Sequence, residues 1–194
     1  MTPALVLALT ITATPGLIQF TMRVNDYVET HRRLAATIEQ PLCSDAEELT
    51  RQADTLAAAI RDARPRAKEG DIFTFAVSEV FRTRIAAMVR RSNFDVAAFL
   101  DRHSSEGEEL QVHVFGTLPW RTRVAVMPII SELPELPPEL EYRFVGRHLV
   151  LIDVGADMVV DVLRDALPLP IDAPAPVAPY TPCSAHPELG ACWM

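Results

Sequence analysis

The stretch from Leu140 to Leu163 constrains the fold more than any other part of the chain. Its apolar residues recur with a period of two, and β-branched and aromatic side chains flank a turn that contains Gly146. This pattern predicts a β-hairpin followed by a third strand from Met158 to Leu163. A hairpin alone is marginally stable in water, so its apolar face needs a cover. The candidate residues of that face are Tyr142, Phe144, Leu149 and Leu151.

The first half of the chain can supply this cover because its apolar residues recur at spacings of three and four. That spacing places them on one face of an amphipathic helix. The expected helical segments are Phe20 to Ile38, Leu49 to Ile60, Val77 to Val89 and Val96 to His103. We therefore expect an α+β fold in which about four N-terminal helices pack on a small C-terminal antiparallel hairpin or meander.

The chain divides into three parts on these patterns. Residues 1–20 are an apolar, signal-like or anchor segment, residues 21–168 are a single α+β domain, and residues 169–194 are a proline-rich tail that contains cysteine. Within the domain, residues 21–103 are expected to be helical and residues 110–165 rich in strands. Alternating residues from Leu110 to Phe115 predict a short strand, and Pro128 is suited to start a short helix.

The apolar stretch from Ala4 to Phe20 carries no charged residue and resembles the apolar region of a secretory signal. It lacks a basic residue near Met1, and Pro15 follows the small residues that would form a cleavage site. Three interpretations stay open: an export signal, an uncleaved anchor that associates with the membrane, and a first helix packed on the core. We favour export to the periplasm or the exterior, with a membrane-anchored protein facing the periplasm as the alternative.

Charge is unevenly distributed along the chain, whose net charge is −8. Residues 93–194 contain 15 acidic and 6 basic residues, whereas residues 23–92 are nearly balanced. Because nucleic-acid affinity depends largely on neutralising phosphates, this acidic second half argues against a nucleic-acid partner.

One basic cluster lies between the second and third expected helices. Arg64, Arg66 and Lys68 precede the turn at Gly70 and Asp71. These cations could contact an anion at a helix end. The alternative is that they are solvated loop charges near the carbonyl end of the preceding helix, where cations are mildly favoured.

Cys183 and Cys192 in the tail are close enough in sequence to form a disulfide in an oxidising compartment. With Cys43 the cysteine count is odd, so one thiol is left over or the pairing differs. A metal site would have to use Cys183, His186 and Cys192, which lack both a Cys-x-x-Cys pair and a fourth ligand. We therefore expect no metal and no cofactor.

The sequence contains none of the common catalytic motifs, such as Gly-x-Ser-x-Gly, His-Glu-x-x-His or a phosphate-binding loop. His31 lies on the apolar stripe of the first expected helix, which favours a core or rim histidine over a catalytic base. Asp153, Asp157 and Asp161 scatter in a strand, and we interpret them as solvated acids. These observations favour a protein that is not an enzyme.

Three segments resemble a family of uncharacterised, exported bacterial proteins. They are Arg23 to Leu34, Ala57 to Thr74 and Leu140 to Arg147, and the resemblance covers roughly Arg23 to Pro168. It implies export and a shared fold, without an activity. The hairpin and third strand are also similar to the periplasmic domain of the nickel and cobalt homeostasis protein family, over some twenty residues.

The function predicted from the sequence is an exported, non-enzymatic bacterial module. In the leading hypothesis it binds a protein or an envelope component, with Trp120 as a candidate contact. The alternatives are a periplasmic protein for metal or small-ligand sensing and homeostasis, and a membrane-anchored accessory subunit attached through residues 1–20.

Overall fold

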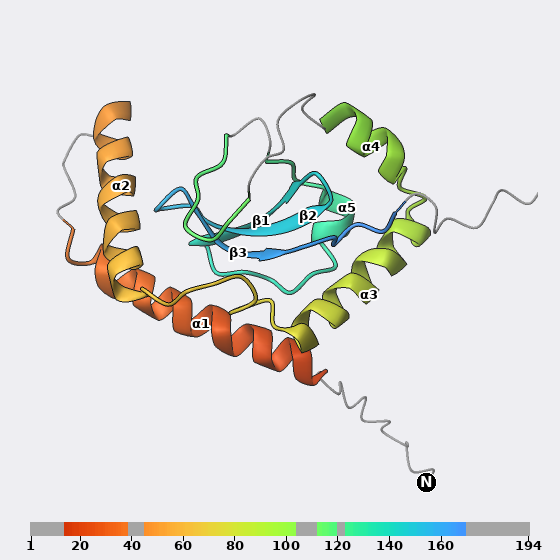
Figure 1. Ribbon diagram of the computed structural model, residues 1–194, viewed down its shortest axis with the longest axis horizontal. Coiled ribbons are helices and arrows are strands. Elements are labelled where there is room, and N and C mark those ends of the chain that lie inside the picture. The colour runs from red at the N-terminus through yellow and green to blue at the C-terminus, as the bar shows by residue number, and fades with distance from the viewer. Residues whose placement is uncertain (1–13, 39–44, 104–111, 120–122, 170–194) are drawn as a thin grey trace, which may run out of the picture.

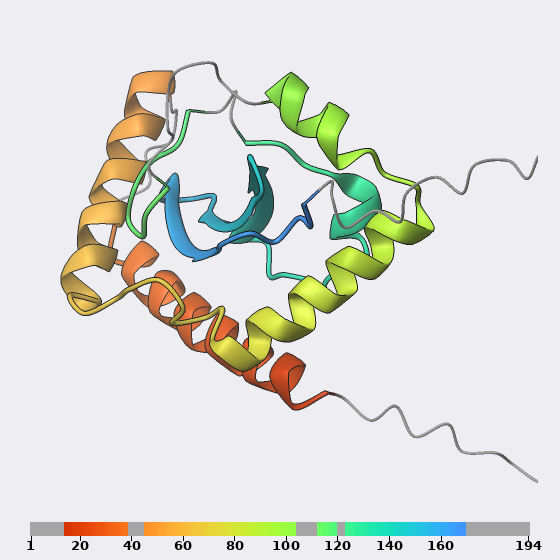
Figure 2. The same ribbon diagram turned by 45° about the vertical axis from the view of Figure 1, so that its right-hand side comes forward.

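The structure is a computed structural model that describes residues 14–38, 45–103, 112–119 and 123–169. It has an α+β fold in which helices surround a three-stranded antiparallel sheet (Figures 1 and 2). The helices are α1 (Pro15–Ala35), α2 (Ala46–Ala63), α3 (Phe75–Arg91), α4 (Val96–His103) and α5 (Met127–Ile130). The strands are β1 (Leu140–Val145), β2 (His148–Asp153) and β3 (Met158–Leu163). The predicted fold class is confirmed, with the short helix α5 in addition to four longer ones.

The sheet is a meander in which β2 lies between β1 and β3. In the first pair, Leu140 is opposite Asp153 and Val145 is opposite His148, so the turn falls at Arg147 and at Gly146, whose φ of 54° suits glycine. The pairing of β2 with β3 shifts its register between Leu151 and Ile152. The predicted hairpin and third strand are thus confirmed.

Both faces of the sheet are buried, which explains why nearly all strand residues are excluded from solvent. On one face, the predicted apolar residues pack in the main core against the apolar stripes of α1, α2 and α3. They are Tyr142, Phe144, Leu149 and Leu151. The other face forms a smaller core, which Val112 and Leu118 cover from the loop that precedes the sheet.

The strand predicted from Leu110 to Phe115 is wrong in its described part. Residues 112–119 form an irregular segment, in which Phe115 has a φ of 68°. It touches the edge of β3 at one point, where Phe115 N donates to Val159 O and Val159 N donates to Gly116 O, both at 2.8 Å. Of the apolar residues in the described part of this stretch, Val112 inserts into the second core, together with Leu118 further along the segment.

Helix α1 starts at Pro15, so the predicted domain boundary after residue 20 falls inside a helix. Proline suits the first helical turn because its missing N–H would have no partner there. Gly16 and Phe20 are both buried, and Phe20 is only 1% exposed in the main core. Residues 15–20 therefore belong to the folded domain.

Candidate functional site

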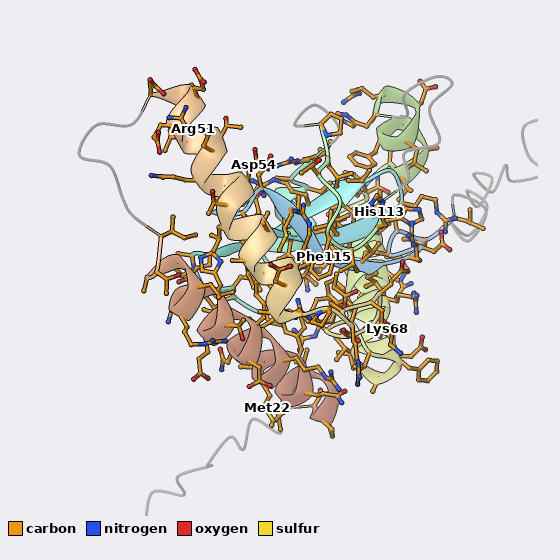
Figure 3. The ribbon with its side chains drawn as sticks, turned by 60° about the vertical axis from the view of Figure 1, so that its left-hand side comes forward. Met22, Arg51, Asp54, Lys68, His113 and Phe115 are labelled. Carbon is orange, nitrogen blue, oxygen red and sulfur yellow. The ribbon has the colours of Figure 1, made fainter. Side chains whose placement is uncertain are left out.

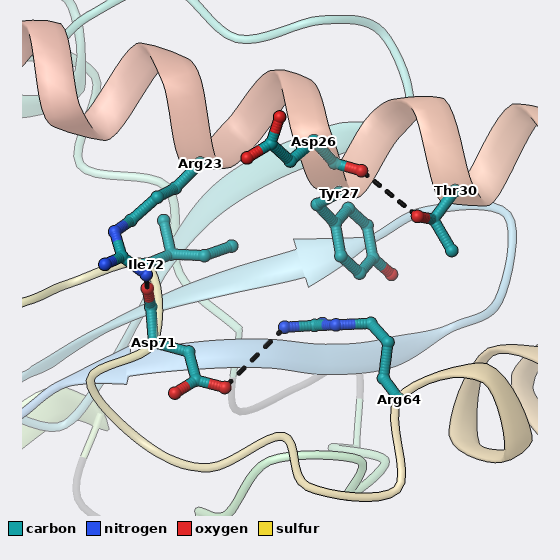
Figure 4. Close-up of a pocket in the computed structure, with 7 residues that line it drawn as sticks. All are labelled: Arg23, Asp26, Tyr27, Thr30, Arg64, Asp71 and Ile72. Carbon is teal, nitrogen blue, oxygen red and sulfur yellow. Dashed lines mark hydrogen bonds and ion pairs between the residues drawn. The ribbon is translucent and has the colours of Figure 1, made fainter.

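The loop between α2 and α3, residues 64–74, carries the basic cluster singled out in the sequence and lies beside α1 (Figures 1 and 4). We call it the α2–α3 loop. Two of its attachments border the cleft described below. One is a carboxylate from the sheet, and the other is an arginine from α1.

The carboxylate of Asp161, in β3, binds the loop through backbone amides. Its Oδ2 accepts from Ile72 N at 2.6 Å and Phe73 N at 2.7 Å, and its Oδ1 accepts from Gly70 N and Val162 N, both at 2.8 Å. Gly70 has a φ of 85°, a left-handed conformation that helps to turn successive amides toward one anion. Burial raises the pKa of Asp161, and the four hydrogen bonds oppose that rise.

The second attachment joins the loop to α1. Arg23 Nη1 donates to the backbone oxygen of Asp71 at 2.5 Å. The carboxylate of Asp71 in turn accepts from Lys68 N at 3.1 Å and lies 3.9 Å from Arg64 Nη2. These contacts leave a cleft between α1 and the loop.

The cleft has a volume of about 360 Å³ and is mainly polar (Figure 4). From here it is called the α1 cleft. Its lining residues are Arg23, Asp26, Tyr27, Thr30, Arg64, Asp71 and Ile72. The volume lies at the small end of the range typical of ligand pockets.

Arg64 is the central cation of the α1 cleft. Its guanidinium carbon lies 5.0 Å from the centre of the Tyr27 ring, a cation–π geometry that fixes the side chain. The Arg64 side chain is 20% exposed, and its Nη1 atom is buried without a hydrogen-bond partner among the described residues. An arginine with an unused donor is suited to bind a carboxylate or phosphate.

Behind Arg64, a buried hydrogen-bond network connects α1 to the sheet. Tyr27 Oη donates to Asp153 Oδ2 at 2.6 Å, and His31 Nδ1 lies 2.6 Å from the same oxygen. The other carboxylate oxygen accepts from Ala156 N at 2.8 Å. Burial, followed by the charge of Asp153, raises the pKa of Tyr27 well above its usual range, so Tyr27 stays a neutral donor.

The hydrogen bond to Asp153 also raises the pKa of His31, although burial opposes that rise. The predicted interpretation of His31 as a core or rim histidine is confirmed, because the residue is 7% exposed. The interpretation of Asp153 and Asp161 as solvated acids is wrong, since both are fully buried. Asp157 does remain half exposed, beside Arg123.

The structure separates the three predicted anion contacts. Arg64 lines the α1 cleft, whereas Arg66 and Lys68 are exposed and do not line it. Lys68 is labelled in Figure 3. The second cation of the cleft is Arg23, which the sequence did not single out as a candidate site residue. A signal was present in the spacing of Arg23, Tyr27 and Thr30, because residues three and four apart are neighbours on the surface of a helix.

Several predicted features lie outside the described residues. They are the Cys183–Cys192 disulfide, the remaining thiol of Cys43, His186 and Trp120. Within the described residues, no group of three or more histidine, cysteine, aspartate or glutamate side chains is placed to hold a metal ion. Among the described helices, none combines the length and the apolar character needed to cross a bilayer.

Comparison of the chain with protein-family models, curated proteins and solved structures finds no significant match. The resemblances stated above therefore stay predictions.

Proposed function

We propose that the protein is an exported, non-enzymatic bacterial binding module whose α1 cleft holds an anionic group. The anion is carried by a free small ligand or by an envelope component. This proposal combines the binding module with the small-ligand alternative predicted from the sequence.

The observation that carries the proposal is the state of Arg64. Tyr27 holds the guanidinium in place, Asp71 Oδ2 is distant at 3.9 Å, and Nη1 has no partner in the described structure. A buried donor without a partner is costly, so an incoming anion that satisfies it, after a small shift of the side chain, gains that free energy.

The non-enzymatic part is supported by the way the buried polar groups are used. Asp161 holds the α2–α3 loop, and Asp153 holds Tyr27 and His31. All of these contacts are within the fold, and they stiffen the walls of the cleft. A rigid, preformed cleft suits binding because little ordering is needed when the ligand enters.

The export part is supported by the apolar stretch that ends at Phe20 and by the family resemblance. Because α1 starts at Pro15 and Phe20 lies in the core, we place the export segment before Pro15. Mass spectrometry of the native protein tests this: we expect a first residue at or before Pro15. A protein that starts after Phe20 would contradict it, and the same spectrum reports whether Cys183 and Cys192 are joined.

Anion binding is tested by NMR titration of the ¹⁵N-labelled protein with acetate, succinate and phosphate. We expect saturable shifts of amides in α1 and the α2–α3 loop, and Arg64→Gln should weaken binding about tenfold or more, as for a charge-assisted hydrogen bond. Arg33→Gln is the matched control, because Arg33 is exposed on the same helix and does not line the cleft.

Sedimentation with purified peptidoglycan separates the two sources of the anion. Retention that Arg64→Gln abolishes indicates an envelope component, and binding of soluble anions without retention indicates a free ligand. If no anion gives a saturable shift and the peptidoglycan does not retain the protein, the proposed function is wrong.

A further inference from the structure

The α1 cleft contains acids as well as cations. Its lining residues include the cations Arg23 and Arg64 and the acids Asp26 and Asp71. A site built for a simple anion would place cations around it and keep carboxylates away, since like charges raise the free energy of the bound state. The presence of Asp26 in the lining, in addition to Asp71, therefore needs its own explanation.

Asp26 is an acid of the lining that is exposed to solvent. Its backbone oxygen accepts from Thr30, but its carboxylate makes no hydrogen bond or ion pair within the described residues. Neither cation of the cleft neutralises it. Arg23 is engaged with the Asp71 backbone, and Arg64 faces the Tyr27 ring and the Asp71 side chain.

The α1 cleft thus has a cationic pole, formed by Arg64 and Arg23, and an anionic pole, formed by Asp26. Each pole has groups that are free to bind a ligand. Arg64 offers the unpartnered Nη1, Arg23 keeps donors beyond the one bonded to Asp71, and Asp26 offers a free carboxylate. Between the poles, the Tyr27 ring and Ile72 provide an apolar wall. Figure 4 shows Tyr27 and Arg64 facing each other between α1 and the loop, with Arg23 nearer the other end of the cleft and the carboxylate of Asp26 beside α1.

We propose that the ligand is a small zwitterion of the amino-acid or dipeptide class. This inference rests on the proposed function and specifies its ligand. The ligand carboxylate binds Arg64 and Arg23, and the ligand ammonium binds Asp26. A simple anion pairs with the cations but leaves Asp26 without a partner, and a simple cation pairs with Asp26 but leaves the arginines without one. A zwitterion is therefore bound in preference to a simple anion or a simple cation.

The test compares three matched pools in NMR titrations of the full-length protein: the twenty free amino acids, their N-acetyl derivatives and their amides. The N-acetyl pool lacks the ammonium and the amide pool lacks the carboxylate. We expect saturable shifts in α1 and the α2–α3 loop with the free amino acids, and binding at least about fivefold weaker with the other two pools.

Two variants assign the poles. Asp26→Asn should weaken binding of the free amino acids about fivefold and leave any binding of the N-acetyl pool unchanged or stronger. Glu29→Gln, which removes an exposed carboxylate from the same helix outside the cleft, should change neither.

The failures are distinguishable. If the N-acetyl pool binds as tightly as the free amino acids, and Asp26→Asn has no effect, the cleft is a simple anion site; the zwitterion inference is then overturned and the proposed function stands. Preferential binding of the amide pool overturns both. Absence of binding by all three pools overturns the zwitterion inference, and the titrations with acetate, succinate and phosphate then decide the proposed function separately.

Discussion

Asp153 and Asp161 are buried carboxylates in a sheet that is otherwise almost entirely apolar. A charged group in such an environment is tolerated when hydrogen bonds satisfy its oxygens. Asp161 receives four backbone N–H groups, and Asp153 receives a tyrosine, a histidine and a backbone amide. Each of them therefore fixes a segment that is distant in sequence, and both segments line or support the α1 cleft.

Replacing Asp161 by asparagine tests the attachment of the α2–α3 loop. One carboxylate oxygen becomes an NH₂ group, so two backbone N–H groups lose their acceptor and face another donor. We expect a loss of about 2–4 kcal/mol in the free energy of unfolding, from the cost of buried unsatisfied donors. Urea denaturation measures it.

The matched control for this variant is Asp157→Asn, at a half-exposed position in the turn between β2 and β3. We expect it to change stability by less than about 1 kcal/mol, as for an exposed ion pair. Equal effects of the two substitutions would show that the hydrogen bonds from the four amides to Asp161 do not contribute to stability.

His31 should make stability depend on pH near neutrality. Because its pKa is raised in the folded state by the hydrogen bond to Asp153, the stabilisation is fully present below the unfolded pKa of about 6.5 and is lost as the pH rises through the folded value. We expect the melting temperature to fall over that window. In His31→Gln the fall should be absent, and superimposable pH profiles of the two proteins would contradict this role.

At the scale of the elements, the close approach of α1 to α3 depends on the absence of a side chain at Gly16. A Cβ atom there would lie 2.9 Å from the backbone oxygen of Ala76 and 3.0 Å from Val80 Cγ2. The backbone oxygen cannot move without shifting α3. Because α1 contributes four of the residues that line the cleft, its angle against α3 matters for the site.

Gly16→Ala should therefore destabilise the protein although alanine is the better helix former. We expect a net loss of about 1–2 kcal/mol, as overpacking outweighs the gain in helix propensity. Thermal unfolding measures it, with Asn25→Ala as the control at an exposed position of the same helix. If Gly16→Ala gains as much stability as Asn25→Ala, the helices are able to separate without cost.

The sequence was sufficient to predict elements whose determinants are local. The period-two pattern located β1, β2 and β3, and the spacing of apolar residues located the four longer helices. It was not sufficient for Asp161, whose partners Ile72 and Phe73 are almost ninety positions away, nor for Arg23, whose role depends on where the α2–α3 loop lies. Local periodicity contains no information about such distant pairings.

At the scale of the whole molecule, the sheet lies inside the protein, covered by helices on one face and by residues 112–118 on the other. This burial explains why the prediction that Asp153 and Asp161 are solvated is wrong. A strand with one solvated face has room for charged residues, but β3 has no such face, so an aspartate within it must have internal partners. Val160 and Val162, which flank Asp161, were the signal in the sequence that this aspartate is buried.

The core also defines where the domain begins. Phe20 contacts the rings of Phe73, Phe81 and Tyr142, with centroids 4.8–6.3 Å apart. A chain that starts at Thr14 and ends at Leu169 retains all of these contacts, whereas a chain that starts at Thr21 loses one ring of the cluster.

We expect the protein comprising residues 14–169 to unfold cooperatively. The protein comprising residues 21–169 should be less stable by about 3–5 kcal/mol, the usual cost of deleting a buried phenylalanine side chain. Calorimetry of the two proteins measures the difference. Equal melting temperatures would show that α1 before Thr21 contributes nothing to the core.

The attachment of the α2–α3 loop to Asp161 has a consequence for how faithfully the chain must fold. Side chains alternate between the faces of a strand, so sliding β3 by a single position would turn this carboxylate away from Ile72 and Phe73 and release one wall of the cleft. The irregularity in pairing between β2 and β3 sets that alignment. A misaligned sheet would keep much of its apolar interior yet have no cleft, so the proposed ligand binding would be a more sensitive measure of correct folding than compactness.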